Sequence, residues 1–187
     1  MTSGLLLYAR SRRIAPTTGV LLASAALLGV VAAADGTAEP RLTVLALAAA
    51  VAAAAPGLGG QDAALDRTAA IRWAPLRAAH VLLIAAAVTL VLLAAQTAAR
   101  EPVTAGFLLR DAAGLTGLAA LGAVLFGAAY AWTPVVGWPA ATLFVPPDPT
   151  GPVGWLLAPP GAGPAAWTAA VLLATGVIGY AAAGPRR

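Results

Sequence analysis

The residues of this chain that could take part in chemistry are few and stand apart in the sequence. Glu101 and Asp111 flank a short segment, EPVTAGFLLRD, and two carboxylates placed in this way could serve general acid–base catalysis. An arginine stands beside each of them, Arg100 and Arg110, and we expect these arginines simply to neutralise the carboxylates. His80 is the only histidine, and because one histidine cannot complete a metal site we expect it only to make a hydrogen bond.

The sequence lacks the residues that several other kinds of active site require. The chain has no cysteine, which excludes disulfides, thiolate nucleophiles and cysteine metal sites. It has no G-x-x-x-x-G-K-[ST] phosphate loop, so it does not bind ATP in that way. We therefore expect no enzyme, no catalytic residue, no cofactor and no metal ion.

The elements that must position these residues are long stretches without charge. Hydrophobic residues make up 60% of the chain, charged residues 10%, and the mean hydropathy is +0.87. An apolar run of about 18 or more residues is long enough to cross the roughly 30 Å hydrocarbon core of a bilayer as a helix. The uncharged stretches are Ile14 to Ala34, Leu42 to Gln61, Ala78 to Ala99, Ala112 to Pro147 and Pro149 to Pro185. The predicted fold class is therefore all-α, a polytopic bundle of transmembrane helices, with residues 1–187 as a single transmembrane domain.

The fourth stretch is too long for one span. Its 36 residues would reach about 54 Å as a helix, and Thr133 is pushed out of helical geometry by Pro134. We expect a fourth span from Ala112 to Trp132 and a short fifth from Val135 to about Pro146, which either crosses fully or is re-entrant. With a sixth span from Ala165 to Ala183, the chain has about six spans.

Prolines set the character of the region between the fifth and sixth spans. Nine of them fall within residues 134–164, and each removes a backbone donor and obstructs the preceding turn. We expect this region to depart from regular helix. Unpaired backbone is not tolerated against lipid, so residues 146–164 should lie outside the hydrocarbon or be covered by neighbouring helices.

Arginines indicate the orientation. All eleven basic residues are arginine, and basic residues favour the cytoplasmic side. With both termini in the cytoplasm, eight arginines fall in cytoplasmic segments and three in outer ones. We therefore predict a multi-pass protein of the cell's inner (plasma) membrane with both termini inside. Because the arginines are spread over loop ends, the net charge of +4 indicates the lipid bilayer as partner and no nucleic acid.

The first span has an alternative interpretation as a cleaved signal peptide. Arg10 to Arg13 resembles a basic n-region, and Ala32 to Ala34 could serve as the cleavage site. An apolar run of 21 residues exceeds the usual length of a signal peptide's apolar region, which favours a true span.

Small residues recur every four positions on two of the predicted spans. Such ridges let two helix backbones approach closely in a membrane. They form either an interface between subunits of a homodimer or heterodimer, or ordinary packing within the chain. The ridge on the fourth span is Ala119, Ala123, Gly127 and Ala131, and that on the sixth is Thr175, Gly179 and Ala183.

The most organised polar segment is the predicted inner loop from Gly59 to His80. Asp62 is suited to cap a helix, and Leu65, Ala69, Trp73 and Leu76 would share one apolar face of it, with Pro75 closing the helix before the third span. A helix of this kind lies in the membrane interface with its charges toward the cytoplasm. It either anchors the topology or offers a docking surface to a soluble partner.

With these features the chain resembles the ABC-2-type transporter permeases. The resemblance is carried by the basic LLLYARSRR before the first span, six spans with both ends inside, the charged helix after the second, and the outer segment PPDPTGPVGWLLAPPGAGPA. That outer segment is similar to the family's re-entrant region between spans five and six. Stretches such as LDRTAAIRWAPLRAAH and RDAAGLTGLAALG also resemble small multi-spanning proteins of actinobacteria.

The resemblance implies a partner and its docking residues. In the family, the loop after the second span is a coupling helix that meets a cytoplasmic ATP-binding subunit. The residues of this chain that would lie at that contact are Asp62, Asp66, Arg67, Arg72 and Trp73. We therefore expect the membrane-spanning permease subunit of a small ABC-type exporter. The alternative is a non-transporting assembly, immunity or scaffold protein that binds another membrane protein.

Overall fold

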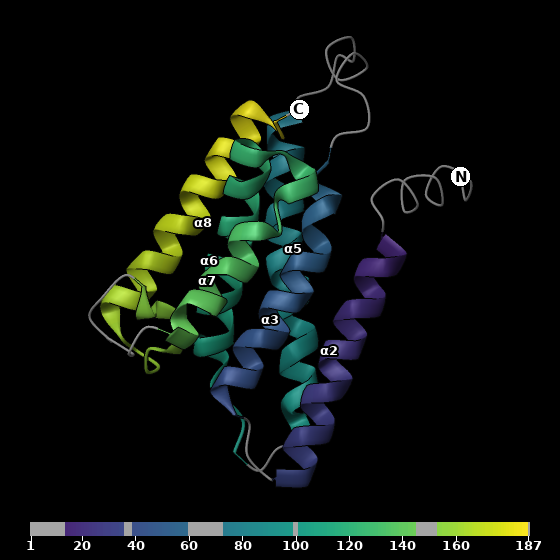
Figure 1. Cartoon of the computed structure of the whole chain (residues 1–187), viewed down its shortest axis with the longest axis vertical. Helices are drawn as coiled ribbons and strands as arrows, with labels where there is room; N and C mark the ends of the chain where they lie inside the picture. The colour runs from purple at the N-terminus through teal and green to yellow at the C-terminus, as the bar shows by residue number, and fades with distance from the viewer. Residues whose placement is uncertain (1–13, 36–38, 60–72, 99–100, 145–152, 187) are drawn as a thin grey trace.

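The computed structural model describes residues 14–35, 39–59, 73–98, 101–144 and 153–186. In these ranges the regular elements are six α-helices and short 3₁₀ turns (Figure 1), which confirms the predicted all-α fold class. The helices are α2 (Ile14–Asp35), α3 (Pro40–Ala54), α5 (Trp73–Ala95), α6 (Ala105–Phe126), α7 (Thr133–Phe144) and α8 (Gly163–Ala183). The 3₁₀ turns are η1 (Ala55–Leu58), η2 (Gln96–Ala98), η3 (Ala128–Tyr130) and η4 (Gly154–Leu157).

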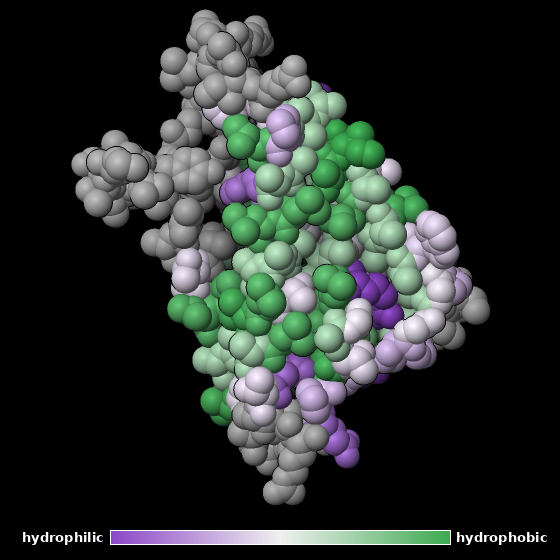
Figure 2. Space-filling model, turned by 180° about the vertical axis from the view of Figure 1, so that it is seen from behind, coloured by the Kyte–Doolittle hydropathy of each residue, from purple (hydrophilic) through white to green (hydrophobic). Residues whose placement is uncertain are grey.

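Four helical segments of the described chain are long and apolar enough to cross a membrane. They are Pro40–Leu58, Trp73–Ala95, Ala105–Phe126 and Gly163–Ala183. Large apolar side chains also cover the outside of the bundle, where Trp167 is 74% exposed and Ile178 67%. Figure 2 shows the resulting hydrophobic band on one face of the molecule. The protein is therefore a membrane-embedded helical bundle, and lipid chains cover the apolar side chains that protein does not.

Side-chain caps explain where two of the helices begin. The Glu39 carboxylate accepts a hydrogen bond of 2.9 Å from the Leu42 N–H, and Pro40 occupies the first turn of α3, where its missing N–H costs nothing. The Thr104 hydroxyl accepts one of 3.3 Å from the Phe107 N–H at the start of α6. The predicted start of this span at Ala112 was therefore wrong, because the cap at Thr104 lets the helix begin seven residues earlier.

The predicted end of the same span at Trp132 was also wrong. Helix α6 ends at Phe126, since Gly127 adopts a φ of +87°, a left-handed conformation that side chains disfavour. A 3₁₀ turn then leads into α7, which is 12 residues long and contains Pro139. A short fifth helix was expected here, and the structure has one, from Thr133 to Phe144.

The third span also begins earlier than predicted. Pro75 was expected to close a preceding helix, but it lies in the first turn of α5, which begins at Trp73. Proline is tolerated there because the first N–H groups of a helix have no partner within it. Trp73 and His80 are accordingly part of the long apolar helix.

Helix α6 lies inside the bundle and packs against α3, α5, α7 and α8. Its closest approach to α8 is at two glycines that face one another. A Cβ atom placed on Gly117 would lie 2.4 Å from the Leu172 carbonyl, and one on Gly176 would lie 2.4 Å from the Gly117 carbonyl oxygen. The two backbones are thus in direct contact, as small residues allow in membrane helices.

The two predicted small-residue ridges have different surroundings in the structure. On α6, Ala119 and Ala123 are buried within the chain, whereas Gly127 lies beyond the helix end. On α8, Thr175 and Ala183 are exposed, and a Cβ on Gly179 would meet nothing within 4 Å. The first ridge therefore packs inside the chain, and the second faces outward.

The two ends of the bundle differ in charge. Helix α8 ends at the same end of the bundle at which α2 and α5 begin (Figure 1). Among the described residues this end carries Arg77 and Arg186 and no acidic side chain. Among the side chains that the structure describes, the opposite end carries three acidic residues and two arginines, namely Glu39, Arg41, Glu101, Arg110 and Asp111. We call the first the basic end and the second the acidic end.

Candidate functional site

Most of the docking residues predicted from the sequence lie outside the described ranges. Asp62, Asp66, Arg67 and Arg72 belong to residues 60–72, of which the structure describes nothing. Trp73 is described, and it is half-buried in the first turn of α5 at the basic end. Gly59, which directly follows η1, lies at the same end. The two residues on either side of positions 60–72, Gly59 and Trp73, are therefore both at the basic end.

The charged pair Arg110 and Asp111 lies at the acidic end, inside α6. It was expected at the mouth of the span, but the earlier start of the helix places it in the second turn. The neutralisation expected for this pair is confirmed, because the Arg110 Nε donates to Asp111 Oδ1 at 2.7 Å. Arg100, which was expected to neutralise Glu101, lies outside the described residues. The Asp111 side chain is fully buried and that of Arg110 is 8% exposed. A pair this well shielded from water must be matched by further hydrogen bonds to remain tolerable.

Arg110 finds those partners on a segment 46 to 49 residues further along the chain. Its guanidinium donates to the carbonyl oxygens of Leu156 (3.4 Å), Ala158 (3.0 Å) and Pro159 (3.2 Å). It also lies 5.0 Å from the centre of the Phe107 ring. Irregular backbone leaves such carbonyls without helical partners, and the planar guanidinium fork can satisfy several at once.

The segment that Arg110 holds is residues 153–162, which we call the returning segment. Its Trp155 is buried and lies against Gly114 of α6, where an added Cβ would come within 2.3 Å of the indole Cη2. On its other side, Trp138 of α7 donates from Nε1 to the Val153 carbonyl at 3.1 Å. Residues 153–162 therefore depart from regular α-helix, as predicted, and Trp155 and Leu156 are buried among neighbouring helices, whereas Pro159 to Gly161 are exposed. The same prediction was wrong for residues 134–144, which belong to helix α7, because Pro134 lies in its first turn and the helix continues through Pro139.

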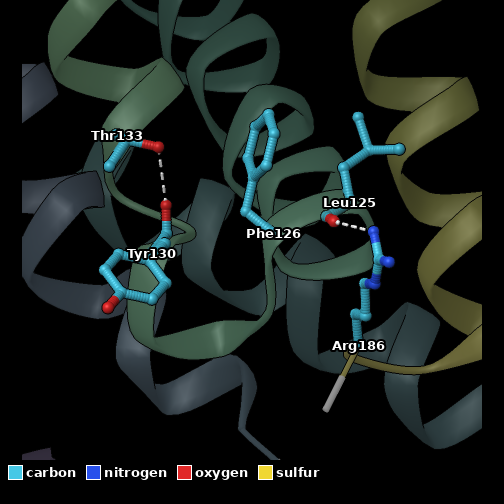
Figure 3. A pocket seen from close by; sticks show the side chains of 5 residues that line it. All are labelled: Leu125, Phe126, Tyr130, Thr133 and Arg186. Carbon is cyan, nitrogen blue, oxygen red and sulfur yellow. Dashed lines mark hydrogen bonds between the residues drawn. The ribbon is translucent and has the colours of Figure 1, made fainter.

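A second polar region lies at the basic end, where α6 stops and α7 starts. An open pocket of about 480 Å³ is lined there by Leu125, Phe126, Tyr130, Thr133 and Arg186. Figure 3 shows Tyr130 and Thr133 on one side of Phe126, and Leu125 and Arg186 on the other. We call this the basic-end pocket.

Arg186 reaches this pocket because the C-terminal tail folds back onto α6. Gly184 turns the chain with a φ of +71°, and the Arg186 N–H then donates to the Ala123 carbonyl at 2.8 Å. The guanidinium Nη1 donates to the Leu125 carbonyl at 3.0 Å. Both carbonyls belong to the last turn of α6, which has no helical donors for them.

The arginines of the sequence predicted only an orientation, and neither Tyr130 nor Arg186 was predicted as a site residue. The tail contact could not be read from spacing, since 61 residues separate Arg186 from Leu125. The signal available in the sequence was a glycine two positions before an arginine at the end of an apolar helix.

The described ranges contain no group of three or more histidine, aspartate or glutamate side chains that could hold a metal ion. No protein-family model, no curated protein and no solved structure matches the chain. The likeness to ABC-2-type permeases therefore stays a prediction from the sequence, and the function has to be argued from the residues of this chain.

Proposed function

We propose that this protein is the membrane-embedded permease subunit of a small exporter that works with a separate ATP-binding subunit. The observation that carries the proposal is the returning segment. A short irregular stretch before the last helix is packed back against α6 by Arg110 and Trp155, at the acidic end. The resemblance to ABC-2-type permeases implies a re-entrant region at this place in the chain.

The charge at the opposite end supports the second half of the proposal. Arg77 and Arg186 lie there with the start of α5, and the positive-inside rule makes this end cytoplasmic. The connection between Gly59 and Trp73 then faces the cytoplasm, where a soluble ATP-binding subunit would meet it. Asp62, Asp66, Arg67 and Arg72 are the charges that we propose for the contact.

The outward-facing ridge on α8 favours a second candidate function. Thr175 and Ala183 are exposed, and Gly179 has open space beside it. Such a face suits close packing against another membrane helix. It fits a scaffold, immunity or assembly protein that binds another membrane protein, and it equally fits the dimer expected of a permease.

Co-expression with an ATP-binding protein encoded beside this gene tests the proposal. We expect the two proteins to purify together and to hydrolyse ATP after reconstitution into vesicles. Alanine at Asp62, Asp66, Arg67 and Arg72 should weaken both the co-purification and the hydrolysis without preventing insertion. The control is alanine at Arg41 and Glu101, which lie at the acidic end.

The outcomes separate the two candidates. Failure of the wild-type protein to bind or stimulate any such ATPase would favour the scaffold function. Full binding and stimulation by the loop variants would show that the loop only anchors the topology.

A further inference from the structure

The basic-end pocket is placed where lipid headgroups meet the protein. It opens at the end of the bundle, between the last turn of α6 and the first turn of α7. Phe126 and Tyr130 line it and are 57% and 60% exposed, and Trp132 beside it is 42% exposed. Exposed aromatic side chains at the end of a spanning helix are typical of the membrane–water interface. The pocket is therefore reached from the headgroup layer.

The polar groups of the pocket suit an anion. Only one of the five N–H donors of the Arg186 guanidinium is used by a described residue, the Leu125 carbonyl. The remaining donors of this planar fork suit the oxygens of a phosphate. The Tyr130 hydroxyl lies on the other side of Phe126 and points away from Arg186 (Figure 3), so it does not share an anion with the guanidinium.

The electrostatic balance at the pocket is also positive. The ends of α6 and α8 each contribute about half a negative charge and the start of α7 about half a positive one, so these three helix dipoles leave about half a negative charge. The full positive charge of Arg186 outweighs it. The Arg77 guanidinium lies nearby, against Gly184, where an added Cβ would be 3.0 Å from Cζ. The described residues of this end include no acidic side chain.

The apolar groups suit an acyl chain. Leu125 and Phe126 belong to the last turn of α6, are 52% and 57% exposed, and line the pocket beside Arg186. A phospholipid would place its phosphate at the guanidinium and its chains along the apolar surface of α6.

We propose that the basic-end pocket binds the headgroup of an anionic phospholipid, with the phosphate at Arg186 and the acyl chains along Leu125 and Phe126. The site is independent of the exporter function and would hold a lipid in a scaffold protein as well. Basic pockets between membrane helices recognise anionic lipids by this combination of charge and apolar surface.

Lipid titration of the purified protein, followed by native mass spectrometry, tests the proposal. The probes are phosphatidylglycerol, which is anionic, phosphatidylcholine, which is zwitterionic, and inorganic phosphate as a free anion. We expect phosphatidylglycerol to bind about tenfold tighter than phosphatidylcholine, because the choline cation of phosphatidylcholine offsets the attraction of its phosphate to Arg186. Arg186→Gln should remove this preference, and its amide can still donate to the Leu125 carbonyl. Arg41→Gln, at the acidic end, should keep it.

Should Arg186→Gln fail to fold, titration of the wild-type protein at raised ammonium acetate concentration gives a second measurement, and we expect screening of the guanidinium charge to reduce the preference about threefold. Equal binding of the two lipids to the wild-type protein would overturn the proposal. A preference that survives in folded Arg186→Gln, or that salt leaves unchanged when this variant does not fold, would overturn it too. Displacement of the lipid by millimolar phosphate would show that the pocket recognises a free anion instead of a lipid.

Discussion

At the scale of single residues, Arg110 does more than the sequence indicates. Its neighbour Asp111 is visible in the sequence, and the pairing of the two was predicted. Its bonds to three carbonyls of the returning segment were not, because they depend on how the chain folds back and not on local spacing. One side chain thus neutralises a buried carboxylate and holds an irregular stretch in place.

Replacing Arg110 should therefore be costly. We expect Arg110→Gln to lower the free energy of unfolding by about 3 to 5 kcal/mol, because it leaves a buried carboxylate without its partner. Asp111→Asn should cost less than this, and the double variant should cost less than the sum of the two single ones. Thermal unfolding in detergent micelles, with Arg41→Gln as the control, measures all three. Costs that simply add would show that the two side chains act independently.

The contact between Trp155 and Gly114 gives a second prediction at this scale. A methyl group at Gly114 would collide with the indole at 2.3 Å, so we expect Gly114→Ala to destabilise the protein by about 1 to 3 kcal/mol. Trp155→Phe in the same chain should recover part of the loss. Gly106→Ala is the matched control in the same helix, because nothing lies within 4 Å of its Cβ position. Equal melting temperatures for the two alanine variants would contradict the packing of the returning segment.

At the scale of elements, the sequence predicts the presence of the helices more accurately than it predicts where they begin and end. Long uncharged runs predicted about six spans, because burial in lipid excludes charge from most of a span. The described ranges hold six α-helices, of which four segments are long and apolar enough to cross a membrane. The start of α6 was missed because its first turns carry Arg110 and Asp111, a neutral pair that the helix tolerates. The end of α6 was missed because Gly127 stops it in the middle of an apolar run.

Likewise, the sequence indicated only some of the small residues that pack where α6 and α8 cross. A spacing of four residues identified Ala119 and Ala123, which are buried within the chain. It did not identify Gly117 and Gly176, whose backbones touch. In a chain rich in alanine many small residues share a spacing, and only the relative rotation of two helices decides which of them meet.

This crossing predicts a contrast between two glycines of one helix. Gly176→Ala would place a methyl group 2.4 Å from the Gly117 carbonyl oxygen, and backbone cannot yield as a side chain can. We expect a loss of about 1 to 3 kcal/mol in the free energy of unfolding. Gly179→Ala, which meets nothing within 4 Å, should be neutral or slightly stabilising. The same unfolding temperature for both variants would show that α6 and α8 do not cross at these glycines.

At the scale of the whole molecule, both proposals depend on which charged residues and chain segments lie at each end of the bundle. The basic end holds the start of α5, the folded-back tail and the basic-end pocket, and the acidic end holds the returning segment clamped by Arg110. Periodicity and charge could predict a bundle with unlike ends. They could not predict the pocket, since it is built from the end of α6, the start of α7 and a tail that is distant in sequence.

The exporter proposal depends on α7 crossing the membrane, so that the basic end, with both ends of the described chain, faces the cytoplasm. Labelling of single cysteines tests this most directly, and the chain offers a clean background because it has no cysteine of its own. Ala129 and Pro160 are exposed and lie at the two sides of α7, with Ala74 and Glu101 as exposed reference positions at the basic and acidic ends.

We expect a membrane-impermeant maleimide to label Glu101→Cys and Pro160→Cys in intact cells, and to label Ala74→Cys and Ala129→Cys only after the membrane is opened. Labelling of Ala129→Cys and Pro160→Cys from the same side would contradict this arrangement, because α7 would then not cross and the last helix would end outside the cell.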